Sequence, residues 1–273
     1  MIKKKIYYWS PYLTEIATTK AVINSAYSVN KYSKTTEALI INAAGEFDNK
    51  KKELDQKGIS ILNLHHFNYT KLLPKYGKIA SRISYLIIFA MSFLKLKNIL
   101  KKNNPDYVII HLITSLPILL FNLFNFKTKC ILRISGYPHL NFLRMFFWKN
   151  FLNKVDMVTC PTISTYNYIK QLNIISDDKL FFLPDPVINI KEINQLKREK
   201  VKIEFKEYFI GIGRLTKQKN FEFLINAFKE IVKISPQKKL LIFGNGEERD
   251  KLNKKIIKMS LQDKVKIFPY NDN

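Results

Sequence analysis

The chain has 273 residues, a length that fits two domains of ordinary size. Hydrophobic residues make up 47% and aromatic residues 13% of the sequence, which excludes a disordered or collagen-like chain. Lys and Arg number 46 against 22 Asp and Glu, so the net charge is +24. Two explanations of this charge stay open: a polyanionic partner, or the residue bias of a gene rich in A and T.

Two cysteines, Cys130 and Cys160, lie in apolar, strand-like runs. A disulfide framework or a zinc cluster needs more thiols at closer spacing, so we expect a reducing, cytoplasmic location. The basic N-terminus has no apolar stretch of signal-peptide length. The longest apolar run, residues 83–94, would cover ~18 Å as a helix, well short of a ~30 Å hydrocarbon core. No membrane span is therefore predicted.

Short β-branched runs alternate with helix-length segments over the first two-thirds of the chain. The strands expected from this pattern are residues 5–9, 38–42, 59–64, 107–111, 130–134, 157–160 and 180–183. Several are continuous apolar runs, as is typical of parallel strands that are covered on both faces. The β-α-β order predicts a mostly parallel sheet whose strands end at one common edge.

A polar stretch rich in Lys and Glu, residues 189–206, predicts a linker with a short helix. The β-α-β order then resumes, with strands expected at 208–212, 239–243 and 264–268 and helices at 220–234 and 247–259. We therefore predict an N-terminal domain over 1–188, a linker over 189–206 and a second domain over 207–273. The second domain contains only half the elements of a doubly wound fold.

Residues 209–221 offer a site for a diphosphate. A strand-like run ends at Gly213 and is followed by Arg214 and a basic loop that opens a helix. Glycine lets a ligand approach the backbone, a helix N-terminus presents unpaired N–H groups, and Arg214 and Lys219 supply positive charge. A plain glycine turn with solvated basic residues stays the alternative. The third glycine of a dinucleotide fingerprint is replaced by Thr216, and no P-loop sequence follows.

Three motifs, in their order along the chain, resemble those of glycosyltransferase family 4. They are GIGRLTKQKNF at 211–221, LLIFGNGEER at 240–249 and LQDKVKIF at 261–268. The resemblance implies the α/β GT-B fold, with two Rossmann-like doubly wound domains facing a cleft and the second incomplete here. It also implies a retaining enzyme that transfers sugar from a nucleoside diphosphate and needs no metal and no other cofactor.

Site residues follow from the same resemblance. It implies that Gly213, Arg214 and Lys219 bind the donor diphosphate. The residues that it places around the nucleotide are Gly244, Gly246, Glu247 and Tyr270. No catalytic residue is assigned.

The first 200 residues match the family more loosely and suggest the acceptor side of the cleft. Residues 106–111 resemble a strand that ends in a cleft-facing histidine, here His111. Many family members carry another strand-end histidine where this chain has Gly136, with His139 three residues further on. A satisfied core position for His111 stays open. The four histidines of the chain lack the spacing of metal ligands.

The donor-binding Glu-x7-Glu segment of the family has no counterpart in the sequence, since no such carboxylate pair follows Phe268. We therefore expect a truncated enzyme or one half of a split enzyme, with impaired activity. A second chain that completes the donor domain is a partner implied by this reading.

Two segments, residues 82–102 and 139–154, mix apolar and basic side chains as an interfacial membrane helix does. A pair of core helices with solvated ends is the alternative. Nucleic acid is not expected as a partner, because no basic motif of a known binding module is present.

Taken together, these features predict a cytoplasmic glycosyltransferase, placed at the inner face of the cell membrane if the membrane reading holds. Its substrates would be a nucleoside-diphosphate sugar and a saccharide or lipid-linked acceptor, in the synthesis of a cell-surface polysaccharide. The alternatives are a non-catalytic fragment or split subunit that binds acceptor or an anionic membrane, and a plain polyanion binder.

Overall fold

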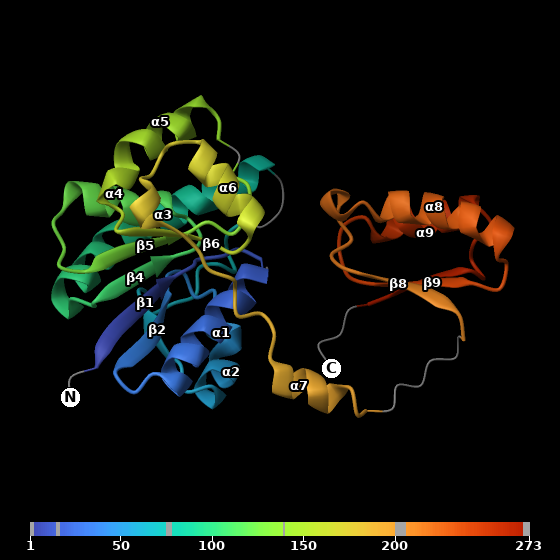
Figure 1. Ribbon diagram of the computed structural model, residues 1–273, viewed down its shortest axis with the longest axis horizontal. Helices are drawn as coiled ribbons and strands as arrows, with labels where there is room; N and C mark the ends of the chain where they lie inside the picture. Colours follow the sequence, from blue (N-terminus) through green and yellow to red (C-terminus); the bar gives the residue numbers. More distant parts are fainter. Residues whose placement is uncertain (1–2, 15–16, 75–77, 139, 200–205, 270–273) are drawn as a thin grey trace. The chain divides into compact units, whose positions relative to one another are not determined.

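The computed structural model describes residues 3–14, 17–74, 78–138, 140–199 and 206–269. The chain forms two compact units, Met1–Ile193 and Asn194–Asn273. The boundary between them falls within the stretch 189–206, in the short helix α7 (Ile190–Leu196). Each unit has its own parallel sheet flanked by helices (Figure 1).

Seven parallel strands build the sheet of the N-terminal unit. They are β1 (Lys4–Trp9), β2 (Thr36–Asn42), β3 (Ser60–Asn63), β4 (Tyr107–Ile110), β5 (Lys129–Arg133), β6 (Met157–Cys160) and β7 (Leu180–Phe182). Their order is β3-β2-β1-β4-β5-β6-β7, in which the direction of winding reverses between β1 and β4. Parallel pairing brings the carboxyl ends of β1, β4 and β5 to one edge.

Helices cover both faces of this sheet (Figure 1). They are α1 (Ala17–Tyr32), α2 (Lys51–Gln56), α3 (Lys78–Asn103), α4 (Ser115–Leu123), α5 (Phe142–Phe151) and α6 (Ile163–Gln171), with the 3-10 turns η1 (Asp48–Lys50), η2 (Leu152–Lys154) and η3 (Asp177–Lys179). The first two helices form one core cluster, in which Val22 and Leu54 pack with Ile40. The other four helices form a second cluster on the opposite face.

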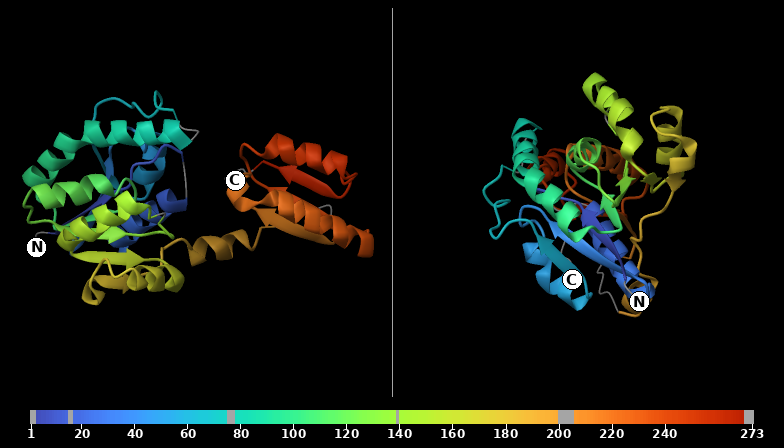
Figure 2. Two further views of the ribbon diagram at one scale, coloured as in Figure 1. Left: turned by 90° about the horizontal axis from the view of Figure 1, so that it is seen from above. Right: turned by 90° about the vertical axis from the view of Figure 1, so that its left-hand side faces the viewer.

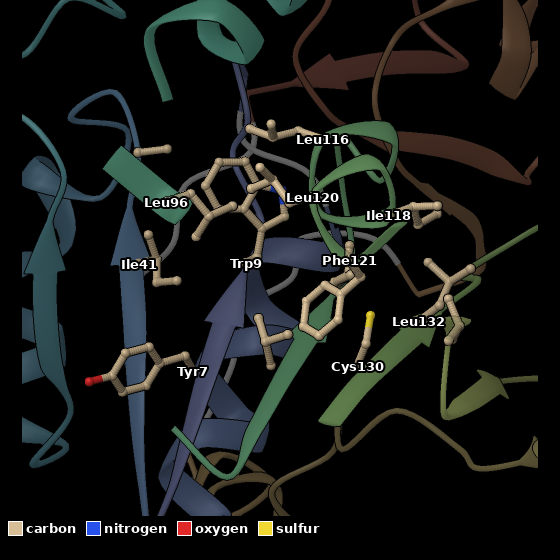
Figure 3. Packing of buried hydrophobic residues seen from close by; sticks show 14 of the residues in the cluster. Tyr7, Trp9, Ile41, Leu96, Leu116, Ile118, Leu120, Phe121, Cys130 and Leu132 are labelled. Carbon is tan, nitrogen blue, oxygen red and sulfur yellow. The ribbon is translucent and has the colours of Figure 1, made fainter. Parts of the chain in front are cut away.

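Trp9 lies at the centre of the larger core. Its side chain is fully buried, and Figure 3 shows it between Leu96 of α3 and Leu120 of α4. The indole N–H donates to the carbonyl oxygen of Ile113 at 3.3 Å. The neighbouring Tyr8 points into the other cluster, so successive residues of β1 feed the two cores in turn. This explains why β1 is apolar without alternation.

Helix α3 is longer than the apolar run alone suggests. It has 26 residues, because helical geometry continues on both sides of residues 83–94, and it runs along one side of the unit (Figure 2). In the part of the chain that the structure describes, residues 79–103 are the one helix long and apolar enough to cross a membrane by length and composition. One face of this helix packs onto the sheet through Ser84, Ile88 and Leu96, which are fully buried.

Within residues 206–269 the C-terminal unit has three parallel strands with two helices on one face (Figure 1). Its elements are β8 (Tyr208–Ile212), the 3-10 turn η4 (Lys217–Lys219), α8 (Phe221–Ile234), β9 (Lys239–Phe243), α9 (Arg249–Lys258) and β10 (Val265–Phe268), with the strand order β10-β9-β8. Phe228 of α8 and Leu252 of α9 share one core cluster with Ile242 of β9.

Strand β8 lies at an open edge of this sheet and is apolar on both faces. The ring of Phe209 faces α8, 6.1 Å from the ring of Phe228. On the other face Tyr208, Ile210 and Ile212 are exposed by 38%, 54% and 64%. A strand that is apolar on both faces is typical of a sheet with helices packed on both sides. Within residues 206–269, helices cover only one face of this sheet.

An ion pair ties the end of β5 to the segment that follows β7. Arg133 is buried, and its Nε and Nη2 donate to Oδ1 of Asp185 at 3.1 and 2.6 Å. The side-chain amide of Asn24 in α1 donates to the carbonyl oxygen of Pro186 at 2.8 Å. The segment around Asp185 is therefore held both by the sheet edge and by α1.

Replacing Asp185 by Asn should lower the free energy of unfolding of the N-terminal unit by about 3 kcal/mol, because Arg133 would stay buried without its counter-ion. Tryptophan fluorescence during urea unfolding reports on this unit alone, since Trp9 and Trp148 are the two tryptophans of the chain. The matched control is Asp177→Asn, which removes the exposed Lys170–Asp177 pair and should cost less than about 1 kcal/mol. Equal losses in both variants would contradict the prediction.

Candidate functional site

The candidate donor residues lie in the two loops that follow β8 and β9. The N–H of Gly213 donates to the carbonyl oxygen of Phe243 at 3.0 Å. Further along, the N–H of Leu215 donates to the Asn245 carbonyl oxygen at 2.9 Å, and the Leu215 carbonyl oxygen accepts the N–H of Glu248 at 3.0 Å. These backbone hydrogen bonds hold the two loops together as one rim at the carboxyl end of the strands.

Gly244 and Gly246 allow this close approach of the loops. A Cβ atom on Gly244 would collide with the carbonyl oxygen of Gly213, and one on Gly246 would lie 2.7 Å from the carbonyl carbon of Leu215. Close packing of the two loops is therefore enough to explain why glycine is needed at both positions. Contact of Gly244, Gly246 and the exposed Glu247 with a nucleotide stays a prediction.

Arg214 and Lys219 place exposed positive charge beside this rim. Lys219 extends along Gly213, since a Cβ atom there would lie 3.9 Å from its Cδ atom. Within residues 206–269 neither cation is paired with a carboxylate, whereas Lys251 of α9 contacts Glu222 at 2.7 Å. Both charges are therefore open to an anionic ligand, and a phosphate oxygen is the acceptor that arginine and lysine bind best.

The backbone after Lys219 turns sharply into α8. Asn220 takes the left-handed conformation with a φ of 50°, which Asn tolerates better than most residues. Its side-chain oxygen accepts the N–H of Phe223 at 3.3 Å and caps the helix. Because α8 begins directly after Lys219, the positive end of its dipole adds to the charge of the loop.

The predicted acceptor residues differ in their access to solvent. His111 follows β4 and is only 7% exposed, whereas Gly136 lies beyond β5 with no atom within 4 Å of its Cβ position. His139 and Tyr270 lie outside the described residues. Gly136 is therefore accessible to a ligand, whereas the His111 side chain is buried.

Three buried side chains at the carboxyl edge of the N-terminal sheet each have an unpartnered polar atom among the described residues. They are Ser10 (Oγ) after β1, His111 (Nδ1) after β4 and Arg133 (Nη1) at the end of β5. Burial, together with the nearby charge of Arg133, lowers the pKa of His111 to about 3, so its imidazole is neutral. Sequence analysis assigns no role to Ser10 or Arg133. The available signals were an arginine at the end of an apolar strand and an aspartate between two prolines.

A pocket of about 510 Å³, lined mostly by residues with polar side chains, opens where the loops after β1, β2 and β3 meet. This β1–β3 pocket is lined by Tyr12, Leu13, Thr14, Gly45, Glu46, Asp48, Asn49, Asn68, Thr70 and Lys71. Ligands of open α/β sheets bind beyond the carboxyl ends of the strands, which is where this pocket lies. Sequence analysis missed it because three separate loops build it and none carries a motif.

Glu46 forms a buried part of the pocket wall. Its two carboxylate oxygens accept the backbone N–H groups of Ala43 and Ala44 at 3.0 and 2.7 Å. Burial raises the pKa of Glu46 to about 7, against the opposing effect of these hydrogen bonds. The carboxyl group can therefore exchange a proton near neutral pH. Across the described residues no three His, Cys, Asp or Glu side chains gather as a metal site requires.

Comparison with known protein families finds a similarity that includes the rim after β8 and β9. Residues 192–273 match the family model of glycosyl transferases group 1. The C-terminal unit is therefore similar to part of a glycosyl transferases group 1 domain. The match includes the loops that hold Arg214, Lys219 and Gly244.

Two curated relatives extend the similarity into the N-terminal unit. An uncharacterized glycosyltransferase of Methanocaldococcus jannaschii is 29% identical over 199 residues, which cover 66% of this chain and 49% of the relative. The N-acetylgalactosamine-N,N'-diacetylbacillosaminyl-diphospho-undecaprenol 4-alpha-N-acetylgalactosaminyltransferase of Campylobacter jejuni is 24% identical over 180 residues, 63% of this chain and 45% of that enzyme. The chain spans about half the length of these curated relatives.

Solved structures confirm the predicted α/β GT-B fold class. A variant of Staphylococcus aureus TarM, crystallised with fondaparinux, α-GlcNAc-glycerol and UDP, has a TM-score of 0.65 at 13% identity, with 98% of this chain and 78% of TarM covered. The UDP-GlcNAc 2-epimerase of Neisseria meningitidis has a TM-score of 0.62 at 15% identity, covering 100% and 73%. Because an epimerase shares the fold, the fold alone does not choose between the two reactions.

Replacing Gly244 by Ala should force the two loops after β8 and β9 apart and destabilise the C-terminal unit by about 2 kcal/mol or more. Hydrogen exchange of peptides from residues 206–269 would show the loss as faster exchange, while tryptophan fluorescence of the N-terminal unit stays unchanged. The control is Gly136→Ala, whose added methyl group meets open space and should change neither readout. Unaltered exchange in Gly244→Ala would contradict the packing role.

The stability of the N-terminal unit should depend on pH through two buried groups that oppose each other. His111, with a pKa of about 3 against 6.5 in the unfolded chain, costs about 2 kcal/mol of stability as pH falls from 7 to 5, because only the unfolded chain gains the proton. Glu46 has a pKa of about 7 in the folded protein against 4.5 in the unfolded chain, so the folded state gains its proton first. Protonation of Glu46 therefore adds about 2 kcal/mol to the free energy of unfolding as pH falls from 7 to 5.

Urea unfolding followed by tryptophan fluorescence at pH 7 and pH 5 separates the two effects. Relative to the wild type, His111→Asn should gain stability on acidification and Glu46→Gln should lose it. If both variants keep the wild-type dependence on pH, neither group titrates as described.

Proposed function

We propose that the intact protein is a cytoplasmic glycosyltransferase that moves a sugar from a nucleoside diphosphate to a saccharide or lipid-linked acceptor, in the synthesis of a cell-surface polysaccharide. The observation that carries the proposal is the exposed pair Arg214 and Lys219 in the loop after β8, neither of which has a carboxylate partner among the described residues. This pair lies in the segment that matches glycosyl transferases group 1. The family match favours sugar transfer over epimerisation, which the fold alone does not.

Arg214 and Lys219 bind the donor diphosphate in this proposal, and Gly213 leaves room for a phosphate to approach the backbone. Negative charge on the diphosphate grows as its bond to the sugar breaks. The two cations therefore stabilise the transition state more than the bound donor, and this difference lowers the barrier. The donor chemistry then requires neither a metal ion nor an organic cofactor. Retention of configuration is carried over from the resemblance to glycosyltransferase family 4.

We propose that the acceptor binds to the N-terminal unit, at the β1–β3 pocket and along the same edge of the sheet to Gly136 beyond β5, with the buried His111 beneath this edge at the end of β4. The pocket lining includes the side chains of Asn49, Asn68 and Lys71, whose polar groups are suited to sugar hydroxyls. TarM was crystallised with α-GlcNAc-glycerol, and the name of the Campylobacter enzyme specifies an undecaprenol diphosphate acceptor. These relatives support a saccharide or lipid-linked acceptor here.

The open edge and uncovered face of β8 support a further proposal about the donor domain. Ile210 and Ile212 are exposed on a strand that is apolar on both faces. We propose that an additional strand and helix cover β8 in the active enzyme, supplied by more of the same chain or by a second chain. Under the alternative, a non-catalytic subunit, the described chain would bind acceptor or membrane without the donor.

Binding of UDP and GDP, measured by isothermal titration calorimetry, tests the donor site. Arg214→Ala and Lys219→Ala should each weaken binding roughly 10- to 100-fold, because each removes one or two charge-assisted hydrogen bonds to the diphosphate. Uridine without phosphate should bind weakly to all variants.

The matched control is Lys229→Ala, an exposed lysine of α8 away from the rim, which should bind like the wild type. If Arg214→Ala and the wild type bind UDP and GDP equally, the donor site is wrong. If a folded wild-type chain binds neither nucleotide while binding acceptor, the non-catalytic alternative replaces the proposal.

A further inference from the structure

Helix α3 exposes an apolar surface on the side that faces away from the sheet. The residues of this α3 outer face are Ile79, Ile83, Leu86, Ile87, Ala90 and Leu94, all exposed. Their spacing of three, four, seven and eight residues puts them on one side of the helix. Leu86 and Leu94 expose 67% and 63% of their surface. From Ile79 to Leu94 the stripe is about 22 Å long.

The opposite side of α3 is fixed to the core. Ser84, Ile88, Ser92, Leu96 and Leu100 follow one another at intervals of four residues and are buried. The hydroxyl of Ser84 donates to the carbonyl oxygen of Pro74 at 2.7 Å. A helix held in this way cannot cross a bilayer without leaving the core of its own unit. Its outer face can, however, lie flat against a surface.

The charge of helix α3 indicates what kind of surface its outer face would bind. Residues 78–103 contain six Lys and Arg and not one Asp or Glu. Lys95, Lys101 and Lys102 are exposed in the last turns of the helix, and Lys97 lies over the ring of Phe124, 4.1 Å from its centroid. An apolar stripe beside cations is the pattern of helices that dock on anionic lipid, where the apolar side chains enter the interface and the cations meet the head groups.

A second element on the same side of the sheet has the same character. Helix α5 exposes Phe142, Leu143 and Phe146 by 83%, 74% and 60%, and residues 140–154 contain no Asp or Glu. Figure 1 shows α3 and α5 both above the seven-stranded sheet, and their buried residues share one core cluster. The exposed apolar surface is therefore concentrated on this side of the unit.

We propose that the α3 outer face docks the protein on an anionic lipid surface, with the helix lying in the plane of the interface. A second copy of the chain is a poorer occupant, because pairing two such faces would bring like charges together without any carboxylate between them. This docking rests on the proposed function in one respect: an enzyme with a lipid-linked acceptor has to meet a membrane.

Co-sedimentation with phosphatidylcholine vesicles, with and without phosphatidylglycerol, tests the proposal. The wild type should bind the anionic vesicles and lose binding as salt rises. The triple variant Ile83→Ser, Leu86→Ser, Leu94→Ser should bind at least about tenfold more weakly, since each change removes apolar surface from the interface. Its control changes three exposed apolar residues of other helices, Tyr32, Ile234 and Ile257, to Ser and should bind like the wild type.

The charge contribution is read in the same assay. Lys95→Gln, Lys101→Gln, Lys102→Gln should weaken binding to anionic vesicles by about tenfold, and the control Lys229→Gln, Lys254→Gln, Lys258→Gln on α8 and α9 should not. The proposal is overturned if the wild type does not bind the anionic vesicles. It is also overturned if the apolar triple variant and its control bind them equally well. A wild-type dimer that the apolar variant dissociates assigns the face to a second copy and also overturns it.

A labelled variant keeps the test independent of the triple substitution. The native cysteines Cys130 and Cys160 are buried, and burial raises the pKa of both thiols, so the variant Leu86→Cys can be labelled selectively at its new, exposed thiol. An environment-sensitive fluorophore there should shift to the blue on anionic vesicles, whereas the same label at Tyr32 should not. No shift at Leu86 overturns the proposal. UDP titration of the same samples shows separately whether the donor site works, so the two failures are distinguishable.

Discussion

Parallel pairing of the strands is the constraint on which the rest of this structure depends. It brings the ends of β1, β4 and β5 to one edge, so Ser10, His111 and Arg133, which are far apart in the chain, follow neighbouring strands. It also buries β1 on both faces. The chemistry of each unit is therefore confined to the loops beyond the carboxyl ends, while the helices on the faces remain available for other contacts.

The rim formed by the loops after β8 and β9 is held in shape by packing and backbone hydrogen bonds. Backbone hydrogen bonds between the loops after β8 and β9 fix the path of the chain, and Gly244 and Gly246 remove the side chains that would separate the loops. Arg214 and Lys219 then remain as exposed charges on a rigid frame. A rigid frame matters for phosphate binding, because cations held in place need little reorganisation when the charge of the ligand grows.

The N-terminal unit combines two surfaces with different chemistry. The β1–β3 pocket is lined mostly by residues with polar side chains, the buried Glu46 among them, whereas the α3 outer face is apolar and flanked by cations. Loops at the sheet edge build the first, and a helix on a face of the sheet builds the second. The lipid-linked acceptor that we propose would have the same two parts, a sugar head and a lipid tail.

The sequence by itself determined the parallel β-α-β order, the positions of most strands to within two residues, and the basic loop after β8. Each of these is written in contiguous residues, as apolar runs, glycines and charges at short spacing. Only the tertiary structure decided that His111 and Arg133 are buried together near the sheet edge, that three loops form a pocket, and that α3 has one buried and one exposed apolar side. Such features depend on which faces meet across long stretches of chain, and an apolar residue has the same letter whether a sheet covers it or solvent does.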